Sequence, residues 1–103
     1  VSALAALAQE HRLALYRLLV RAGARGMAAG ALAERLDVPN SSLSFHLAAL
    51  SRAGLIGHRR QGRSLIYRAD FDRMNRLVGY LMENCCADAD CAAAAPTQER
   101  KSA

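Results

Sequence analysis

Apolar residues recur every three or four positions through the first part of the chain, which is the spacing of helices with one buried face. A polar break at residues 9–11 divides this segment into two helices, and Gly23 and Gly26 end the second one. The apolar positions of the two helices are Leu4, Leu7, Leu13, Leu15, Tyr16, Leu18, Leu19 and Val20.

The segment "AAGALAERLDVPNSSLSFHLAALSRAGLI" predicts two more helices separated by a tight turn. The first is short and ends near Leu36. The second opens near Pro39, a residue that suits a first helical turn. Asn40 or Ser41 is expected to cap this helix, and Gly54 is expected to end it.

The apolar period shortens in "LIGHRRQGRSLIYRAD", where two runs rich in Leu, Ile and Tyr flank Gly62. A glycine at this place supplies the positive φ that a tight β-hairpin needs. Helical spacing returns in the final segment "FDRMNRLVGYLMEN", whose apolar positions are Phe71, Met74, Leu77, Val78 and Leu81. The sequence therefore predicts a mostly α fold with a small β-hairpin, in the order ααααββα.

Composition narrows the class of partner. A chain of 103 residues fits one small domain, without a deep active-site cavity between two domains. Residues 1–84 hold twelve arginines against six acidic residues. Guanidinium forks suit phosphates and guanine edges, so this excess favours a polyanion, although a genome bias towards arginine gives the same count. No apolar run spans a bilayer and no signal-peptide pattern appears, so we expect a cytoplasmic protein with no membrane partner.

The helix over residues 41–53 has two contrasting faces. One face carries Leu43, Leu47 and Leu50. The opposite face is small and uncharged, and comprises Ser41, Ser44, Phe45 and Ala48. An ordinary surface helix carries Glu and Lys outside, whereas short side chains let a helix enter a DNA major groove and reach base edges. We therefore favour a DNA recognition helix.

Two features flank this helix. His46 lies at the edge of the leucine face, so it is expected to be packed or hydrogen-bonded, with metal binding as a minor alternative. The hairpin places Arg59, Arg60 and Arg63 around Gly62. Such a basic tip suits a minor groove or phosphates, and a solvated turn is the alternative.

The stretch "GMAAGALAERLDVPNSSLSFHLAALSRAGLIGHRRQGRSLIYRAD", with helices on both sides, resembles the ArsR/SmtB family of bacterial repressors that sense metals and metalloids. The resemblance covers residues 4–84. It implies a winged helix-turn-helix homodimer, formed through the first and last helices, that binds operator DNA and leaves it when inducer binds. It also implies base, phosphate and wing contacts to DNA by Ser41, Ser42, Ser44, Phe45, Arg60 and Arg63.

The chain divides into residues 1–84, the DNA-binding and dimerisation domain, and residues 85–103, a tail whose end is expected to be disordered. All cysteines lie in this tail, at Cys85, Cys86 and Cys91. In a reducing compartment, such a cluster indicates metal or redox chemistry and not a structural disulfide framework.

Other sensor positions of the family lack ligands in this chain. The helix before the recognition helix has no cysteine, and the last helix has no histidine. The histidines, His11, His46 and His58, lie on three separate elements without ligand spacing.

Three thiolates with no histidine nearby suit a soft, three-coordinate centre. As(III) and Sb(III) prefer a trigonal pyramid of sulfurs, whereas zinc normally takes four ligands. Neighbours on a helix point about 100° apart, so Cys85 and Cys86 share one ion only where the helix frays, and Cys91 must loop back. We therefore expect a repressor of an arsenic-resistance operon, which As(III) or Sb(III) releases from DNA.

Two alternatives remain for the cysteines. Cys91 can pair with Cys85 or Cys86 in a thiol redox sensor. The cluster can also sense another soft metal (Cd, Pb or Zn), and Asp88 or Asp90 can supply zinc with a fourth, oxygen ligand. A thiol enzyme needs a low-pKa thiolate, whereas these neighbouring carboxylates raise thiol pKa values. We therefore expect no enzymatic activity.

Overall fold

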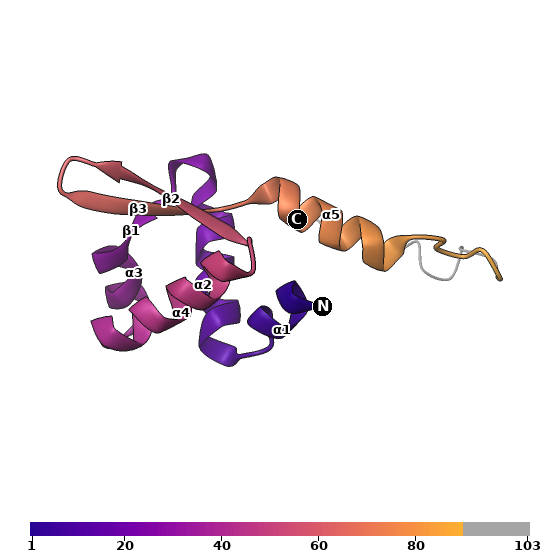
Figure 1. Ribbon diagram of the computed structural model, residues 1–103, viewed down its shortest axis with the longest axis horizontal. Helices are drawn as coiled ribbons and strands as arrows, with labels where there is room; N and C mark the ends of the chain where they lie inside the picture. The colour runs from indigo at the N-terminus through magenta and orange to yellow at the C-terminus, as the bar shows by residue number, and fades with distance from the viewer. Residues whose placement is uncertain (90–103) are drawn as a thin grey trace.

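The computed structural model describes residues 1–89, and this part of the chain confirms a mostly helical fold with a small hairpin (Figure 1). No helix within it combines the length and apolar character needed to cross a membrane. The elements are α1 (Ser2–Leu7), α2 (Glu10–Ala22), the 3₁₀ turn η1 (Gly23–Arg25), β1 (Met27–Ala28), α3 (Ala29–Leu36), α4 (Asn40–Arg52), β2 (Ile56–Gln61), β3 (Ser64–Ala69) and α5 (Phe71–Met82).

The polar break between α1 and α2 is confirmed and has a simple cause. Gln9 adopts an extended conformation (φ −142°, ψ 131°), and its side-chain oxygen accepts a hydrogen bond of 2.9 Å from the backbone N–H of Arg12. This bond satisfies one of the orphan donors at the start of α2. At the other end, Gly23 leaves the helix with φ 71°.

The connection between α3 and α4 confirms the expected turn but corrects the expected cap. Asp37 takes a left-handed φ of 55°, which ends α3. Asn40 is already the first helical residue, so neither it nor Ser41 caps α4. The cap position belongs to Pro39, whose ring holds φ at −63° and whose side chain accepts no hydrogen bond. Gly54 has φ 76° just beyond α4, as expected of a residue that ends the helix.

The hairpin is confirmed, and a third strand joins it. Gln61 pairs with Ser64 across an antiparallel ladder, which leaves two residues in the turn, and the first of them, Gly62, has φ 63°. β1 pairs with the other edge of β3, opposite Tyr67, so the strand order is β1-β3-β2. A strand of two residues has no detectable period, which is why the sequence did not reveal β1.

The core lies where α2, α3, α4 and the base of the hairpin meet (Figure 1). Three apolar positions of the first two helices, Leu4, Leu13 and Val20, are exposed and do not join this core. A helix packed on one side buries one stripe, and these residues lie beside that stripe. The fully buried side chains are Leu15, Leu19, Leu32, Leu50 and Leu55.

α5 extends away from this core (Figure 1). The Asp70 carboxylate caps it by accepting from the backbone N–H of Arg73 at 3.0 Å. None of its residues is buried, and only Met74 and Leu77 pack against the edge of the core. The predicted apolar stripe of this helix is therefore present but uncovered in the single chain.

Candidate DNA interface and cysteine cluster

The outer face of α4 presents the side chains expected on a recognition helix. Ser41, Ser44 and Phe45 are exposed, Phe45 to 60% of its surface, and Ser42 is half-buried beside them. The opposite face buries Leu43, Leu47 and Leu50, which fix α4 against α2 and α3. Packing of the leucines thus determines which side chains point outward.

The start of α4 adds backbone donors to this face. Because Pro39 provides no side-chain acceptor, the first N–H groups of the helix have no cap. Such N–H groups, together with the positive end of the helix dipole, attract anions. The start of α4 therefore favours a DNA phosphate, and the serine hydroxyls lie at this same end of the helix.

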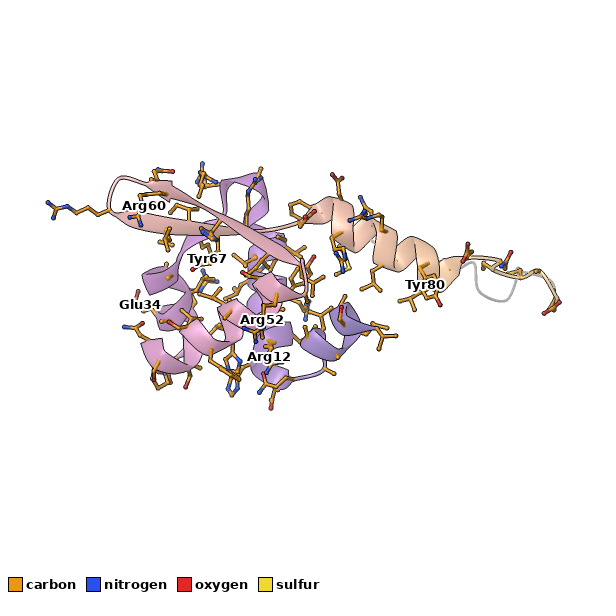
Figure 2. All side chains as sticks on the ribbon, in the orientation of Figure 1. Arg12, Glu34, Arg52, Arg60, Tyr67 and Tyr80 are labelled. Atoms are coloured by element: carbon orange, nitrogen blue, oxygen red, sulfur yellow. The ribbon has the colours of Figure 1, made fainter. Side chains whose placement is uncertain are left out.

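The arginines of the hairpin fall into two groups. Arg59 is held against the body of the protein, because its Nη2 donates to the Arg25 carbonyl at 3.2 Å and to Gln61 Oε1 at 3.4 Å. Arg60 and Arg63 are exposed and have no hydrogen-bond or ion-pair partner within residues 1–89. The hairpin tip that carries them lies at the same end of the molecule as α3 and the start of α4 (Figures 1 and 2).

Two of the predicted thiol ligands lie beyond the end of α5. The helix stops at Met82, and the chain then turns through Asn84 and Cys86, which have φ values of 62° and 63°. This change of direction brings the Sγ atoms of Cys85 and Cys86 to 3.3 Å from each other. Adjacent cysteines on a continuous helix would diverge, so the expectation that they meet only past regular helix agrees with this geometry.

The third predicted ligand, Cys91, lies outside the described residues, as do Asp90 and the segment from Pro96 that was expected to be disordered. Within residues 1–89, no group of three His, Cys, Asp or Glu side chains is arranged to hold a metal ion. The three-thiolate site therefore stays a prediction.

One cluster was missed by the sequence, which placed the histidines on unrelated elements. The rings of His11 in α2 and His46 in α4 stack with centroids 5.7 Å apart. Arg12 Nε donates to His46 Nδ1 at 3.4 Å, which confirms the expected hydrogen-bonded histidine. Burial, followed by the charge of Arg12 and then His11, lowers the pKa of His46 below its ordinary value. The partners are more than thirty positions apart, so no local spacing signals them.

Sequence comparison identifies known relatives of this chain. A family model described as a helix-turn-helix domain matches residues 7–59. The nodulation protein NolR of Rhizobium meliloti is 33% identical over 87 residues, which cover 84% of this chain and 69% of NolR. The transcriptional activator HlyU of Vibrio cholerae is 30% identical over 83 residues, covering 81% of this chain and 74% of HlyU.

Solved structures agree in fold. A homodimeric winged helix-turn-helix DNA-binding domain from Mycobacterium bovis, described as a possible ArsR-family regulator, superposes with a TM-score of 0.64 at 29% identity, covering 81% of this chain and 77% of that one. A crystal structure called "possible transcriptional regulator for arsenical resistance" gives 0.65 at 28% identity, covering 80% and 85%. With its helix-turn-helix, its hairpin wing and these relatives, the chain belongs to the ArsR/SmtB family of winged helix-turn-helix transcriptional regulators.

Proposed function

We propose that this regulator is a homodimeric repressor of an arsenic-resistance operon, which leaves its double-stranded operator DNA when As(III) or Sb(III) binds Cys85, Cys86 and Cys91. Its action is binding and not catalysis, and it takes place in the cytoplasm, where operator DNA lies. The observation that carries the inducer assignment is the 3.3 Å separation of the Cys85 and Cys86 sulfurs directly beyond α5.

The DNA contacts are assigned to two surfaces. Ser41, Ser42, Ser44 and Phe45 on α4 reach base edges and phosphates in the major groove, supported by the exposure of Ser41, Ser44 and Phe45 and by the uncapped start of the helix. Arg60 and Arg63 bind flanking phosphates from the wing. Arg59 was predicted to contact DNA with them, but its bond to the Arg25 carbonyl favours a role in anchoring the wing to η1. Each phosphate neutralised lowers log K by about 0.9 per tenfold rise in salt concentration.

The dimer is assigned to α5 and α1. Five large apolar side chains of α5 are exposed in the single chain, and a stripe of this kind is characteristic of a protein interface. The hollow between the two helices is lined by Val1 and Ala3 on one side and by Leu77 and Tyr80, together with Arg73 and Arg76, on the other, so α1 lies beside the apolar stripe of α5. The exposed residues of α5 are Phe71, Val78, Tyr80, Leu81 and Met82.

The position of the sulfurs suits one shared inducer atom. Two thiolates that each lie about 2.3 Å from a common ion are separated by less than about 4.6 Å, and the Sγ atoms of Cys85 and Cys86 lie within this limit. Cys86 is disulfide-bonded in this structure, so reduction of that bond must precede inducer binding. Condensation of arsenous acid with three thiols releases three waters and leaves a neutral product. The product therefore does not repel DNA by charge, and release must follow from a change in conformation.

The end of α5 is a suitable place for such a change. Joining Cys91 to Cys85 and Cys86 closes a loop directly after the proposed dimer helix. An altered α5 can shift the two subunits relative to each other and so change the spacing of the two recognition helices. One structural relative has arsenical resistance in its name, whereas NolR and HlyU carry other names and HlyU is called an activator. Both the identity of the inducer and the repressing action therefore belong to this proposal.

The test is an operator-release titration followed by fluorescence anisotropy. Cys85→Ser, Cys86→Ser and Cys91→Ser are each expected to bind operator with near wild-type affinity, because the site lies away from α4, but to lose release by As(III). Asp88→Asn is the matched control, since it changes a neighbouring oxygen ligand without removing a thiolate. X-ray absorption of the As(III)-loaded protein is expected to show three sulfur neighbours per arsenic.

Two results would overturn the inducer assignment. Full release by As(III) from a protein lacking all three thiols would exclude the cysteines as the site. Release by peroxide or by Cd, Pb or Zn, with no response to As(III), would replace it with redox or other soft-metal sensing by the same fold.

A further inference from the structure

Four side chains from two helices meet beside the proposed DNA face, and no part of the proposed function uses this contact. Besides its hydrogen bond to His46, Arg12 places its guanidinium carbon 5.6 Å from the centroid of the Phe45 ring. Phe45 also meets His46 edge-on at 5.8 Å. Figure 2 shows Arg12 where α2 and α4 lie side by side. A single residue of α2 therefore touches an exposed residue of the recognition helix and its half-buried neighbour.

The backbone of Arg12 is itself fixed. Its N–H donates to the Gln9 side chain in the first turn of α2, so the residue sits on a capped helix start and not on a mobile loop. The guanidinium is donor-only, so the Nδ1 atom of His46 must be the acceptor in their bond. This requires the neutral imidazole with its proton on Nε2.

We propose that Arg12 is a positioning residue that holds Phe45 in its DNA-contacting orientation, and that it does so only while His46 is neutral. The proposal rests on the assignment of Phe45 to the DNA surface. Phe45 is exposed, and without a neighbour its ring has freedom of rotation that DNA binding would have to remove. The cation–π contact limits that freedom before DNA arrives.

Protonation of His46 removes this support. The charged ring has donors at both nitrogens, so Nδ1 no longer accepts from Arg12, and the two cations repel each other. Within residues 1–89, the charged or titratable groups that lower the pKa of His46 are Arg12 and His11, both from α2. These neighbours and burial lower the pKa of His46, so the neutral form prevails at neutral pH and is lost only in acid.

The direction in which operator affinity changes as pH falls distinguishes this effect from ordinary electrostatic attraction to DNA. A protein that gains positive charge on histidine normally binds phosphates more tightly as pH falls. Loss of the Arg12–His46 bond instead weakens operator binding in acid. The proposal thus makes His46 a group whose protonation opposes binding, although it adds positive charge near DNA.

The experiment measures operator affinity and random-duplex affinity for wild type, Arg12→Lys, Phe45→Ala and the double variant. Arg12→Lys keeps the charge but lacks the guanidinium plane and the Nε donor, and it is expected to weaken operator binding about fivefold with little effect on random duplex. The same change should have almost no further effect in the Phe45→Ala background. Arg17→Lys is the matched control, because Arg17 is exposed on α2 and has no hydrogen bond or ion pair within residues 1–89.

A pH series from 7.5 to 5.5 supplies the second readout. His46→Asn keeps an acceptor near the position of Nδ1 and does not titrate, so operator affinity of this variant should fall less in acid than that of wild type. His11→Gln tests the contribution of the neighbouring ring separately.

Four outcomes overturn the proposal. Additive effects of Arg12→Lys and Phe45→Ala would exclude coupling between the two residues. Equal pH profiles for wild type and His46→Asn would exclude the neutral-histidine requirement. If Phe45→Ala leaves operator affinity unchanged, the DNA face itself is misassigned and this inference fails with it, whereas a strong Phe45→Ala effect with an inert Arg12→Lys leaves the DNA face standing.

Discussion

Helices α4 and α5 have nearly the same length, 13 and 12 residues, yet they end up in opposite situations. α4 turns three leucines into the core and leaves small polar groups and one phenylalanine outside. α5 buries no residue and leaves its apolar stripe in contact with water, as Tyr80 on the far part of this helix illustrates (Figure 2).

The difference shows what an amphipathic pattern does and does not specify. The apolar spacing of both helices states that one face is to be buried. It does not state whether the covering surface belongs to the same chain. α4 is covered by α2 and α3, whereas the stripe of α5 extends past the core, which makes it the natural contact for a second copy.

The largest expected effect comes from the covered face. Leu50 is fully buried, so Leu50→Ala removes methyl groups and leaves a cavity. We expect the free energy of unfolding to fall by about 2–5 kcal/mol in urea titrations monitored by circular dichroism. Leu4→Ala, at a residue exposed to 42%, should change it far less, and equal losses would contradict the assigned core.

A substitution on the uncovered apolar face of α5 should change the dimer dissociation constant and not the fold of the single subunit. Leu81→Ser replaces a side chain exposed to 56%, so the single subunit should keep its fold. If Leu81 is buried between subunits, the lost burial of about 1.5–3 kcal/mol raises the dimer dissociation constant by roughly ten- to a hundredfold.

Sedimentation velocity across protein concentrations measures this shift. Asp72→Ser, on the polar side of α5, is the control and should leave association unchanged. A Leu81→Ser protein that associates as wild type would place the dimer contact elsewhere.

Substitutions on the outer face of α4 should reduce the specificity of DNA binding, whereas substitutions on the wing should reduce affinity for any duplex. Ser44→Ala removes one hydrogen bond to an uncharged group and should cost about 1 kcal/mol of specific binding. Arg63→Ala should weaken operator and random duplex alike, and reduce the slope of log K against log salt by about 0.9. Anisotropy titrations of both duplexes at several salt concentrations separate the two. Identical behaviour of the variants would mean that the α4 face does not read bases.

Much of this comparison was predictable because it depends on local rules. Helical spacing predicted all five helices, while Gly54 marked the end of α4 and Gly62 the turn of the hairpin through positive φ. Local rules failed at the cap of α4. The extended backbone of Pro39 places it at the cap position, so the helix begins at Asn40.

The rest depends on tertiary structure, which spacing does not encode. The pairing of β1 with β3 joins residues about forty positions apart, and the Arg12–His46 contact spans thirty-four. The exposure of the apolar stripe of α5 likewise depends on tertiary structure, because the core ends before it covers most of this helix. For the cysteines, the proximity of Cys85 and Cys86 past the end of the helix agrees with expectation, whereas the role of all three cysteines as inducer ligands stays a prediction.

The smallest expected effect concerns a single buried atom, the hydroxyl oxygen of Tyr16 in the core. Tyr16 is exposed to only 4%, and its hydroxyl oxygen has no hydrogen-bond partner within residues 1–89. A buried hydroxyl without a partner costs free energy, so Tyr16→Phe should leave stability unchanged or raise it by up to about 1 kcal/mol.

The same substitution also has a pH signature. Burial, and then the Asp70 carboxylate, raise the pKa of Tyr16 above its ordinary value of 10.0. The folded protein therefore retains this proton where the unfolded chain loses it, so wild-type stability falls as pH rises above about 10. Tyr16→Phe removes this contribution, and its unfolding free energy should decline less between pH 9 and 11. Tyr80→Phe, at a residue exposed to 70%, is the control and should follow wild type. If Tyr16→Phe destabilises the protein at neutral pH, the hydroxyl has a partner after all, and the covered region is more polar than its apolar packing indicates.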